Sequence, residues 1–140
     1  MAWQAHYPQH EPQWLVKAPG RDMWVAGLMI EGHTYQLYNA DTESATTFDR
    51  QGAKRKRTVL NRPLPRWARY PAGVIFHLSQ QGLVVDGMGL VLAGDEPPGP
   101  RYDYGLGMAI AALVYTYHQQ PYDAELLLQI VDAVRRDYME

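Results

Sequence analysis

Hydrophobic and polar residues alternate in the first third of the chain, and this pattern predicts β-strands. Four segments carry it, either as strict alternation or as short apolar runs bounded by turn residues. They cover residues 14–18, 23–30, 33–38 and 44–48. Pro19-Gly20 and Glu31-Gly32 lie between neighbouring segments and predict turns there. We therefore expect the first third of the chain to form much of a sheet.

Apolar residues recur every three or four positions in three later segments, which predicts helices with one buried face each. The first face comprises Trp67, Tyr70, Val74 and Leu78, the second Leu106, Ile110, Leu113, Val114 and Tyr117, and the third Leu126, Leu127, Ile130, Val131, Val134 and Tyr138. Pro71 is expected in the first turn of its helix or at a kink, because proline has no backbone N–H to donate. Asp123 is expected to cap the third helix. A further strand is predicted at 88–93.

Residues 51–60 are interpreted as a hairpin, with a basic tip after Gln51-Gly52 and a returning strand at 58–60. Residues 1–12 are interpreted as an N-terminal arm that either packs on another surface or frays. Residues 13–140 then form a single domain. The order of the elements predicts a two-layer α+β fold, in which a mixed or antiparallel sheet carries helices on one face.

Composition narrows the class of protein. The 140 residues are 46% hydrophobic and 20% charged, which is typical of a globular domain, and the net charge of -2 indicates neither nucleic acid nor an anionic membrane as an overall partner. The absence of cysteine excludes disulfides and thiolate chemistry and suits a reducing cytoplasm. The N-terminus lacks the basic start and apolar run of a signal peptide, and no apolar run reaches the roughly 20 residues of a membrane helix.

The connection between the strand at 88–93 and the next helix is the main candidate site. Glycines before a helix let backbone N–H groups approach a phosphate closely. The candidate nucleotide-binding residues are Gly99, Arg101, Asp103, Gly105 and Gly107. Pro100 removes one N–H, however, Tyr102 and Tyr104 are bulky, and the Asp103 carboxylate would repel phosphate. An ordinary strand-to-helix connection is the alternative interpretation.

Three segments, in this order and spacing, resemble the GHMP family of small-molecule kinases, and galactokinases most closely. They are APGR at 18–21, PRWARYPAGVI at 65–75, and PPG at 97–99 with the helix that follows. The resemblance runs from about residue 14 to the C-terminus. It implies the fold of the N-terminal domain of that family, which is also found in part of a small-subunit ribosomal protein.

The chain departs from the family's pattern at the positions that carry its chemistry. The family's phosphate loop reads P-x-G-x-G-L-S-S-S-A, and Asp103, Tyr104 and Gly105 stand where its three serines supply hydroxyls for phosphate and Mg²⁺. Residues 26–30 replace the family's sugar-binding motif, and its catalytic Asp and C-terminal domain would follow Glu140. Arg21 is the one remaining family residue with a possible catalytic role, and a contact that anchors its loop is the other explanation for it.

These departures predict a degenerate, non-catalytic GHMP-kinase-like domain that acts as a binding or assembly module without a cofactor. A first alternative is one half of a split ATP-dependent sugar kinase, completed by a separate C-terminal chain, with Mg-ATP as its cofactor. A second is RNA binding, with a solvated turn as the other interpretation of the basic residues Lys54, Arg55, Lys56 and Arg57. The five histidines show no ligand-like spacing, so no metal site is expected.

A domain that normally packs against a second domain has an apolar face that needs cover. The chain is rich in tryptophan and tyrosine, which are enriched at interfaces. We therefore expect a homodimer, or a partner chain that covers this face, and the aromatic arm reaches over the neighbour in this interpretation.

Overall fold

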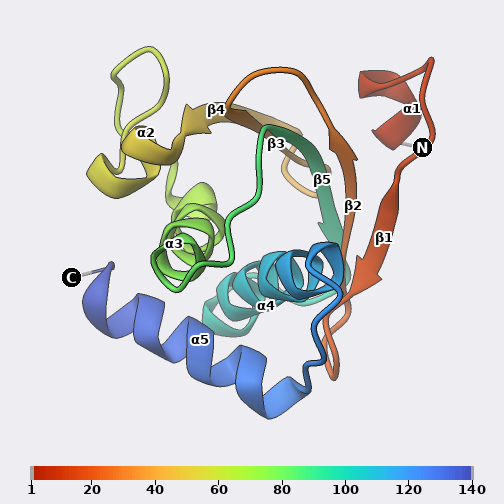
Figure 1. Cartoon of the computed structure of the whole chain (residues 1–140). Helices are drawn as coiled ribbons and strands as arrows, with labels where there is room; N and C mark the ends of the chain where they lie inside the picture. Colours follow the sequence, from red (N-terminus) through yellow and green to blue (C-terminus); the bar gives the residue numbers. More distant parts are fainter. Residues whose placement is uncertain (1, 140) are drawn as a thin grey trace.

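Five strands form one mixed sheet, which the computed structural model describes within residues 2–139, apart from the side chain of Ala2. The strands are β1 (Trp14–Lys17), β2 (Met23–Met29), β3 (Thr34–Asn39), β4 (Ser44–Asp49) and β5 (Met88–Gly94). Their order across the sheet is β1-β2-β5-β3-β4. The β3–β5 pair is parallel and the other three pairs are antiparallel (Figure 1). The predicted α+β fold with a mixed sheet is confirmed.

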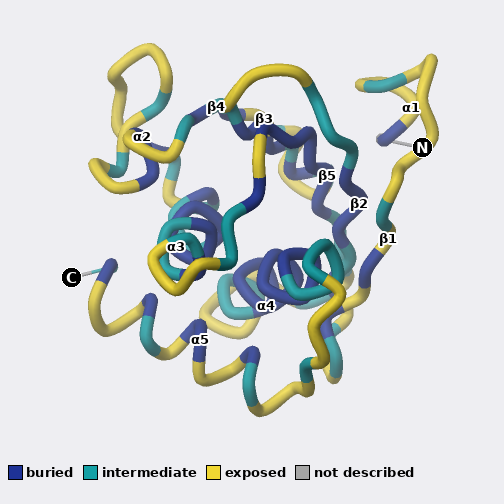
Figure 2. Tube along the Cα trace, viewed as in Figure 1, coloured by how far each residue is buried: buried dark blue, intermediate teal, exposed yellow. Residues whose placement is uncertain are grey.

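Three long helices lie on one side of the sheet. They are α3 (Arg66–Gln80), α4 (Pro100–Tyr117) and α5 (Ala124–Asp137). The α4 helix packs on β1 and β2, and α5 packs on α3 and α4 on the side away from the sheet (Figure 1). Because α4 lies between the sheet and α5, its residues 105–114 are all buried, whereas α5 keeps an exposed outer side (Figure 2).

The three helical faces predicted from the sequence are confirmed, with one adjustment. Asp123 caps α5 as expected, since its carboxylate accepts a hydrogen bond of 2.8 Å from the Leu126 N–H. Pro71 lies in the second turn of α3, one turn beyond the position expected for it. Gly73 explains how closely α5 approaches α3, because a Cβ at this position would lie 2.6 Å from Cγ1 of Val134.

The basic segment folds differently from the expected hairpin. Residues Arg50–Arg55 form a short helix, α2, which the Asp49 carboxylate caps by accepting a 2.6 Å hydrogen bond from the Gly52 N–H. The expected strand at 58–60 is a turn, and a single bridge joins Arg57 to Pro63. An acidic cap at the start and basic residues at the end both favour a helix here. The sequence interpretation missed this because it weighed only the charges and the glycine.

The N-terminal arm packs on its own sheet, on the face opposite the long helices. Its first turns form α1 (Ala2–His6), in which Trp3 is buried and donates from its indole N–H to the His10 carbonyl at 2.9 Å. Tyr7 lies against Gly89, where no side chain intervenes. The frayed alternative for the arm is therefore wrong. Among the residues described, no helix is both long and apolar enough to span a membrane.

Candidate functional site

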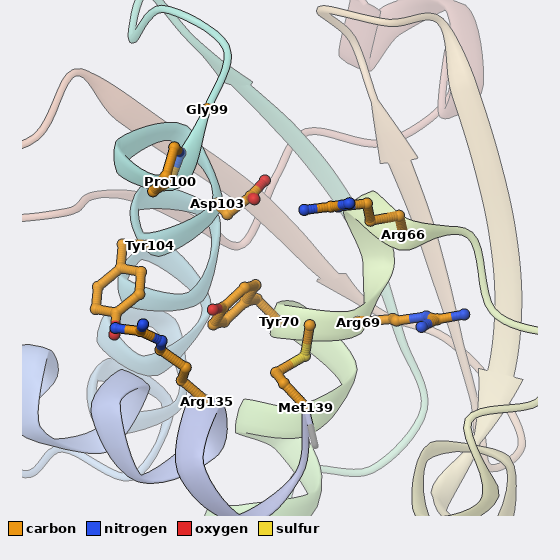
Figure 3. A pocket seen from close by; sticks show the side chains of 9 residues that line it. All are labelled: Arg66, Arg69, Tyr70, Gly99, Pro100, Asp103, Tyr104, Arg135 and Met139. Atoms are coloured by element: carbon orange, nitrogen blue, oxygen red, sulfur yellow. The ribbon is translucent and has the colours of Figure 1, made fainter.

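A pocket of about 470 Å³ opens where the start of α4 meets the start of α3 and the end of α5 (Figure 3). We call it the α4 pocket. It is lined by Arg66, Arg69, Tyr70, Gly99, Pro100, Asp103, Tyr104, Arg135 and Met139. The residues come from three segments far apart in the sequence, so the pocket exists only in the folded chain.

The local sequence leaves the start of α4 open toward this pocket. Gly99 has a φ of 135°, which favours glycine, and Pro100 occupies the first helical position, where a missing N–H costs nothing. No side chain caps the helix. The first helical hydrogen bond runs from the Asp103 N–H to the Gly99 carbonyl at 3.1 Å, so the N–H groups of Arg101 and Tyr102 precede it. Together with the helix dipole they favour an anion.

Two arginines add positive charge to the pocket. Figure 3 shows Arg66 pointing toward Asp103 and the Arg135 guanidinium lying beside the Tyr104 hydroxyl. Arg69 instead extends away from α4, and its Nε donates to the Leu64 carbonyl at 3.3 Å. The ion pairs within residues 2–139 are Arg101–Glu96 and Arg136–Asp137, so Arg66 and Arg135 form no ion pair with a described carboxylate.

The remaining polar side chains among the described lining residues carry one carboxyl and two phenols. Partial burial raises the pKa of Asp103 above its ordinary value, while the charge of Arg66 opposes this shift. The Tyr104 hydroxyl donates to Asp132 at 2.7 Å, and its ring lies 5.6 Å from that of Tyr70. The tyrosines therefore form a wall held by α5, and the pocket carries more positive than negative groups.

The predicted nucleotide-binding residues divide into three groups. Gly99 and Asp103 line the pocket. Arg101 points elsewhere, with its Nε 2.9 Å from the Glu96 carboxylate. Gly105 and Gly107 lie inside α4, where they allow contact with neighbouring elements rather than with a ligand. The segment interpreted as a loop is thus mostly helix.

Of the two tyrosines expected to fill the phosphate position, Tyr102 points away from the α4 pocket, whereas Tyr104 lines it. The Tyr102 hydroxyl reaches the end of β3, where it accepts from the Asn39 amide at 3.0 Å and donates to the Asp41 carboxylate at 2.8 Å. Burial and the hydrogen bond to Asp41 raise the pKa of Tyr102 to about 12. The expected steric obstruction by Tyr102 is therefore wrong, because a helix places this side chain on the far side of its first turn.

Arg21 and the four basic residues of the second alternative lie outside the α4 pocket. The Nε of Arg21 is 3.5 Å from the Met108 sulfur, a contact that ties the β1–β2 turn to α4. Lys54 and Arg55 are exposed on α2, whereas the Nζ of Lys56 lies 5.0 Å from the centre of the Tyr138 ring. Arg57 is exposed and donates to the Asn61 carbonyl at 3.5 Å. RNA binding by this segment stays a prediction.

Sequence reasoning missed Arg66 and Arg135 as site residues. Arg66 belongs to a segment that resembles the kinases, but the start of α4 and Arg135, which it meets in the pocket, lie about 35 and 70 residues further along the chain. Arg135 is one of two adjacent arginines at the end of α5, and only the packing of α5 distinguishes it from Arg136. No group of three or more His, Asp or Glu side chains suited to a metal ion occurs among the residues described.

Solved structures of three kinases share the fold of this chain. Lactococcus lactis galactokinase, crystallised with galactose, matches with a TM-score of 0.68 and 17% identity, over 86% of this chain and 31% of the galactokinase. Methanococcus jannaschii mevalonate kinase matches with a TM-score of 0.63 and 7% identity, over 81% of this chain and 36% of the kinase. Streptococcus pneumoniae phosphomevalonate kinase, in complex with phosphomevalonate and AMPPNP, matches with a TM-score of 0.56 and 17% identity, over 89% of this chain and 36% of the kinase.

The chain spans about a third of the length of these kinases. Scans of protein-family models and of curated proteins find no match. The identities are low, so the likeness is one of fold, and it agrees with the segments at 18–21, 65–75 and 97–99 that carry the resemblance in the sequence. The chain therefore has the fold shared by galactokinase and mevalonate kinase, as the resemblance to GHMP kinases predicted.

Proposed function

We propose that the chain is a non-catalytic, GHMP-kinase-like binding module that holds a phosphate-bearing small molecule in the α4 pocket. The observation that carries this proposal is the convergence of Arg66 and Arg135, from two other helices, on the uncapped start of α4. Guanidinium groups bind phosphate oxygens through several N–H donors at once, and the helix start supplies further donors. The pocket thus combines arginine side chains and a helix start, both of which are suited to binding phosphate.

The composition of the pocket favours binding over phosphoryl transfer. The resemblance implies serine hydroxyls for phosphate and Mg²⁺, and none of the described lining residues is a serine or threonine. Among the described lining residues Asp103 has the single carboxyl, which points toward Arg66 (Figure 3). Phosphoryl transfer depends on metal ions and an orienting base placed around the transferred group. Arginines without these partners suit a ligand that is held and released unchanged.

Calorimetry with a matched pair of variants tests the proposal. Arg135→Gln removes a pocket guanidinium, whereas Arg136→Gln removes its neighbour, which pairs with Asp137 on the exposed side of α5. Inorganic phosphate and galactose 1-phosphate should bind the parent chain and Arg136→Gln alike, and Arg135→Gln at least about tenfold more weakly. Equal binding by both variants, or no binding by the parent chain, would contradict the proposal.

The split sugar kinase remains the second candidate, because the chain matches about a third of galactokinase. In that case Mg²⁺ with a nonhydrolysable ATP analogue should bind more tightly than inorganic phosphate. The same calorimeter therefore separates the candidates: a preference for Mg-nucleotide supports the split kinase, and a preference for metal-free phosphate esters supports the binding module. Self-association also stays a proposal, which sedimentation over a concentration series tests.

A further inference from the structure

A second hollow, of about 530 Å³, lies on the opposite face of the sheet beside α1. We call it the outer groove. It is lined by Trp3, Leu15, Trp24, Ala26, Ala40, Asp41, Val91, Ala93, Gly94 and Asp95. Its volume falls within the roughly 300–1,000 Å³ of small-molecule sites. None of these residues belongs to the α4 pocket or to the segments that resemble the kinases.

The groove exists because the arm covers only part of this face. Ala26 pairs with Val91 and Trp24 with Ala93, so small side chains form the floor between the strands. Tyr7 covers the sheet at Gly89, and Trp3 is the last residue of the arm that covers it. Ala26 and Val91 are buried in a cluster with Trp3, so the accessible part of the floor is at Ala93, with the half-buried Trp24 and the exposed Leu15 beside it.

The ring of Trp24 already attracts a positive charge. The Nζ of Lys17, from the neighbouring strand, lies 5.5 Å from its centre. The face of an indole ring is negative, and within about 6 Å of its centre it attracts ammonium groups. This pairing indicates that a cation is favourable at this ring, and Lys17 itself does not line the groove.

Carboxylates close one end of the groove. Asp41 is held in place by the Gly94 N–H at 3.0 Å and by the Tyr102 hydroxyl at 2.8 Å, both of which donate to it. Asp95 is exposed beside it, and its backbone N–H donates to the Asp22 carbonyl at 2.9 Å. None of the described lining residues is basic. Aromatic rings, an apolar floor and an acidic end therefore meet in one hollow.

We propose that the outer groove binds a small organic cation with an apolar body, such as a quaternary ammonium compound. The methyl groups of the ligand contact Trp24, Leu15 and Ala93, and its positive charge lies between the Trp24 ring and the carboxylates. A compact cation of this kind loses little hydration when it enters an apolar site, unlike a primary ammonium. This site is independent of phosphate binding in the α4 pocket.

A neutral isostere provides the sharpest test. Choline and 3,3-dimethyl-1-butanol have nearly the same shape and differ in the charge of the quaternary centre. Titration of each into the full chain, followed by the NMR signal of the Trp24 indole N–H, should give saturation by choline at a concentration at least about tenfold lower. Equal binding of the two compounds, or no shift with choline, would overturn the proposal.

Three variants extend this test, because two should weaken choline binding and one should strengthen it. Trp24→Leu keeps an apolar wall but removes the ring, and Asp95→Asn removes a charge, so both should weaken choline binding several-fold. Lys17→Ala removes the competing cation and should strengthen it. Lys54→Ala and Asp86→Asn make the same chemical changes at exposed positions outside the groove and should leave the affinity unchanged.

Thermal melts and phosphate titration show which variants keep their fold, and only folded variants are compared. If Trp24→Leu folds and the sedimentation coefficient falls with this variant alone, a second copy of the chain covers the groove, and the proposal is overturned. If choline affinity falls in Trp24→Leu and Asp95→Asn and rises in Lys17→Ala while phosphate binding stays constant, the proposal is supported, whatever the outcome for the α4 pocket.

Discussion

The two sides of the sheet carry hollows of opposite electrostatic character. On the helical side, guanidinium groups from α3 and α5 surround the start of α4. On the other side, tryptophan rings and carboxylates surround a floor of alanine and valine. The difference follows from geometry: helix ends supply backbone charge and long side chains, whereas a sheet supplies a flat surface whose character depends on alternate residues.

Tyr102 connects the two regions. Its backbone N–H lies at the start of α4, while its hydroxyl reaches Asp41 at the rim of the outer groove. The backbone of Tyr102 thus belongs to the helix start beside the α4 pocket, and its hydroxyl holds a carboxylate of the outer groove. Substitutions at the pocket arginines, at Tyr102 and in the first turns of α4 test this difference between the two sides. They are expected to change ligand affinity or folding stability by different amounts.

Loss of both pocket arginines should have the largest effect. In Arg66→Gln/Arg135→Gln the helix start and Arg69, which extends away from α4, are the positive groups that remain among the described lining residues, so phosphate affinity should fall by about a hundredfold or more. Choline affinity in the outer groove should not change, because neither side chain lines it. Calorimetry with both ligands checks this, and a parallel loss of both affinities would refute the separation of the two faces.

Tyr102→Phe should cost about 2 kcal/mol of folding stability. The Asn39 side chain is buried, and its amide would lose the hydroxyl to which it donates. Denaturant unfolding measures the loss, with Tyr115→Phe as control, since no hydrogen bond of the Tyr115 hydroxyl occurs within the described residues. A loss no greater than that of the control would contradict the bridging role.

The same residue predicts an alkaline dependence. The pKa of Tyr102 is raised to about 12, above the ordinary value of 10.0, by burial and by the hydrogen bond to Asp41. The protonated hydroxyl therefore contributes its full stability below pH 10, and the contribution is lost as the pH rises from there through about 12. Tyr102→Phe should unfold with a shallower alkaline decline than the parent chain.

The sequence predicted the architecture well because the apolar periods are clear. The faces of α3, α4 and α5 and the cap at Asp123 were all confirmed. The error at residues 50–60 arose where an acidic cap, Asp49, outweighed the turn tendency of Gly52. Local patterns identify elements, but a single capping contact decides between a helix and a hairpin in a short segment.

The site was predicted only in part. Gly99 and Asp103, which line the α4 pocket, could be singled out because a phosphate loop has a local signature. Arg66 and Arg135 were not, because only the packing of α3 and α5 on α4 brings them together. The orientation of Tyr102 depends on the helical phase of the first turn, which changes when the start of a helix shifts by one residue. These features follow from tertiary contacts that a pattern along the chain does not contain.

Gly105→Ala should stabilise the fold by about 0.5–1 kcal/mol, because alanine is the better helix former. A Cβ at this position would lie 3.5 Å from Cβ of Met23, which is ordinary contact. If Gly105 were a ligand-contacting glycine, the added methyl group would weaken phosphate binding. We expect unchanged affinity by calorimetry and a raised melting temperature, and a loss of affinity would return Gly105 to the site.

Asp103→Asn should have the smallest effect, an increase of about twofold in anion affinity, since it removes one partly screened negative charge from the α4 pocket. Sulfate is the suitable probe, because its own charge is constant over the relevant pH range. The pKa of Asp103 is raised above its ordinary value of 3.8 by partial burial. Its ionised form therefore costs stability at neutral pH, and this cost fades as the pH falls through the raised pKa. Sulfate affinity of the parent chain should rise over the same interval more steeply than that of Asp103→Asn, and identical pH profiles would place the carboxyl outside the reach of the anion.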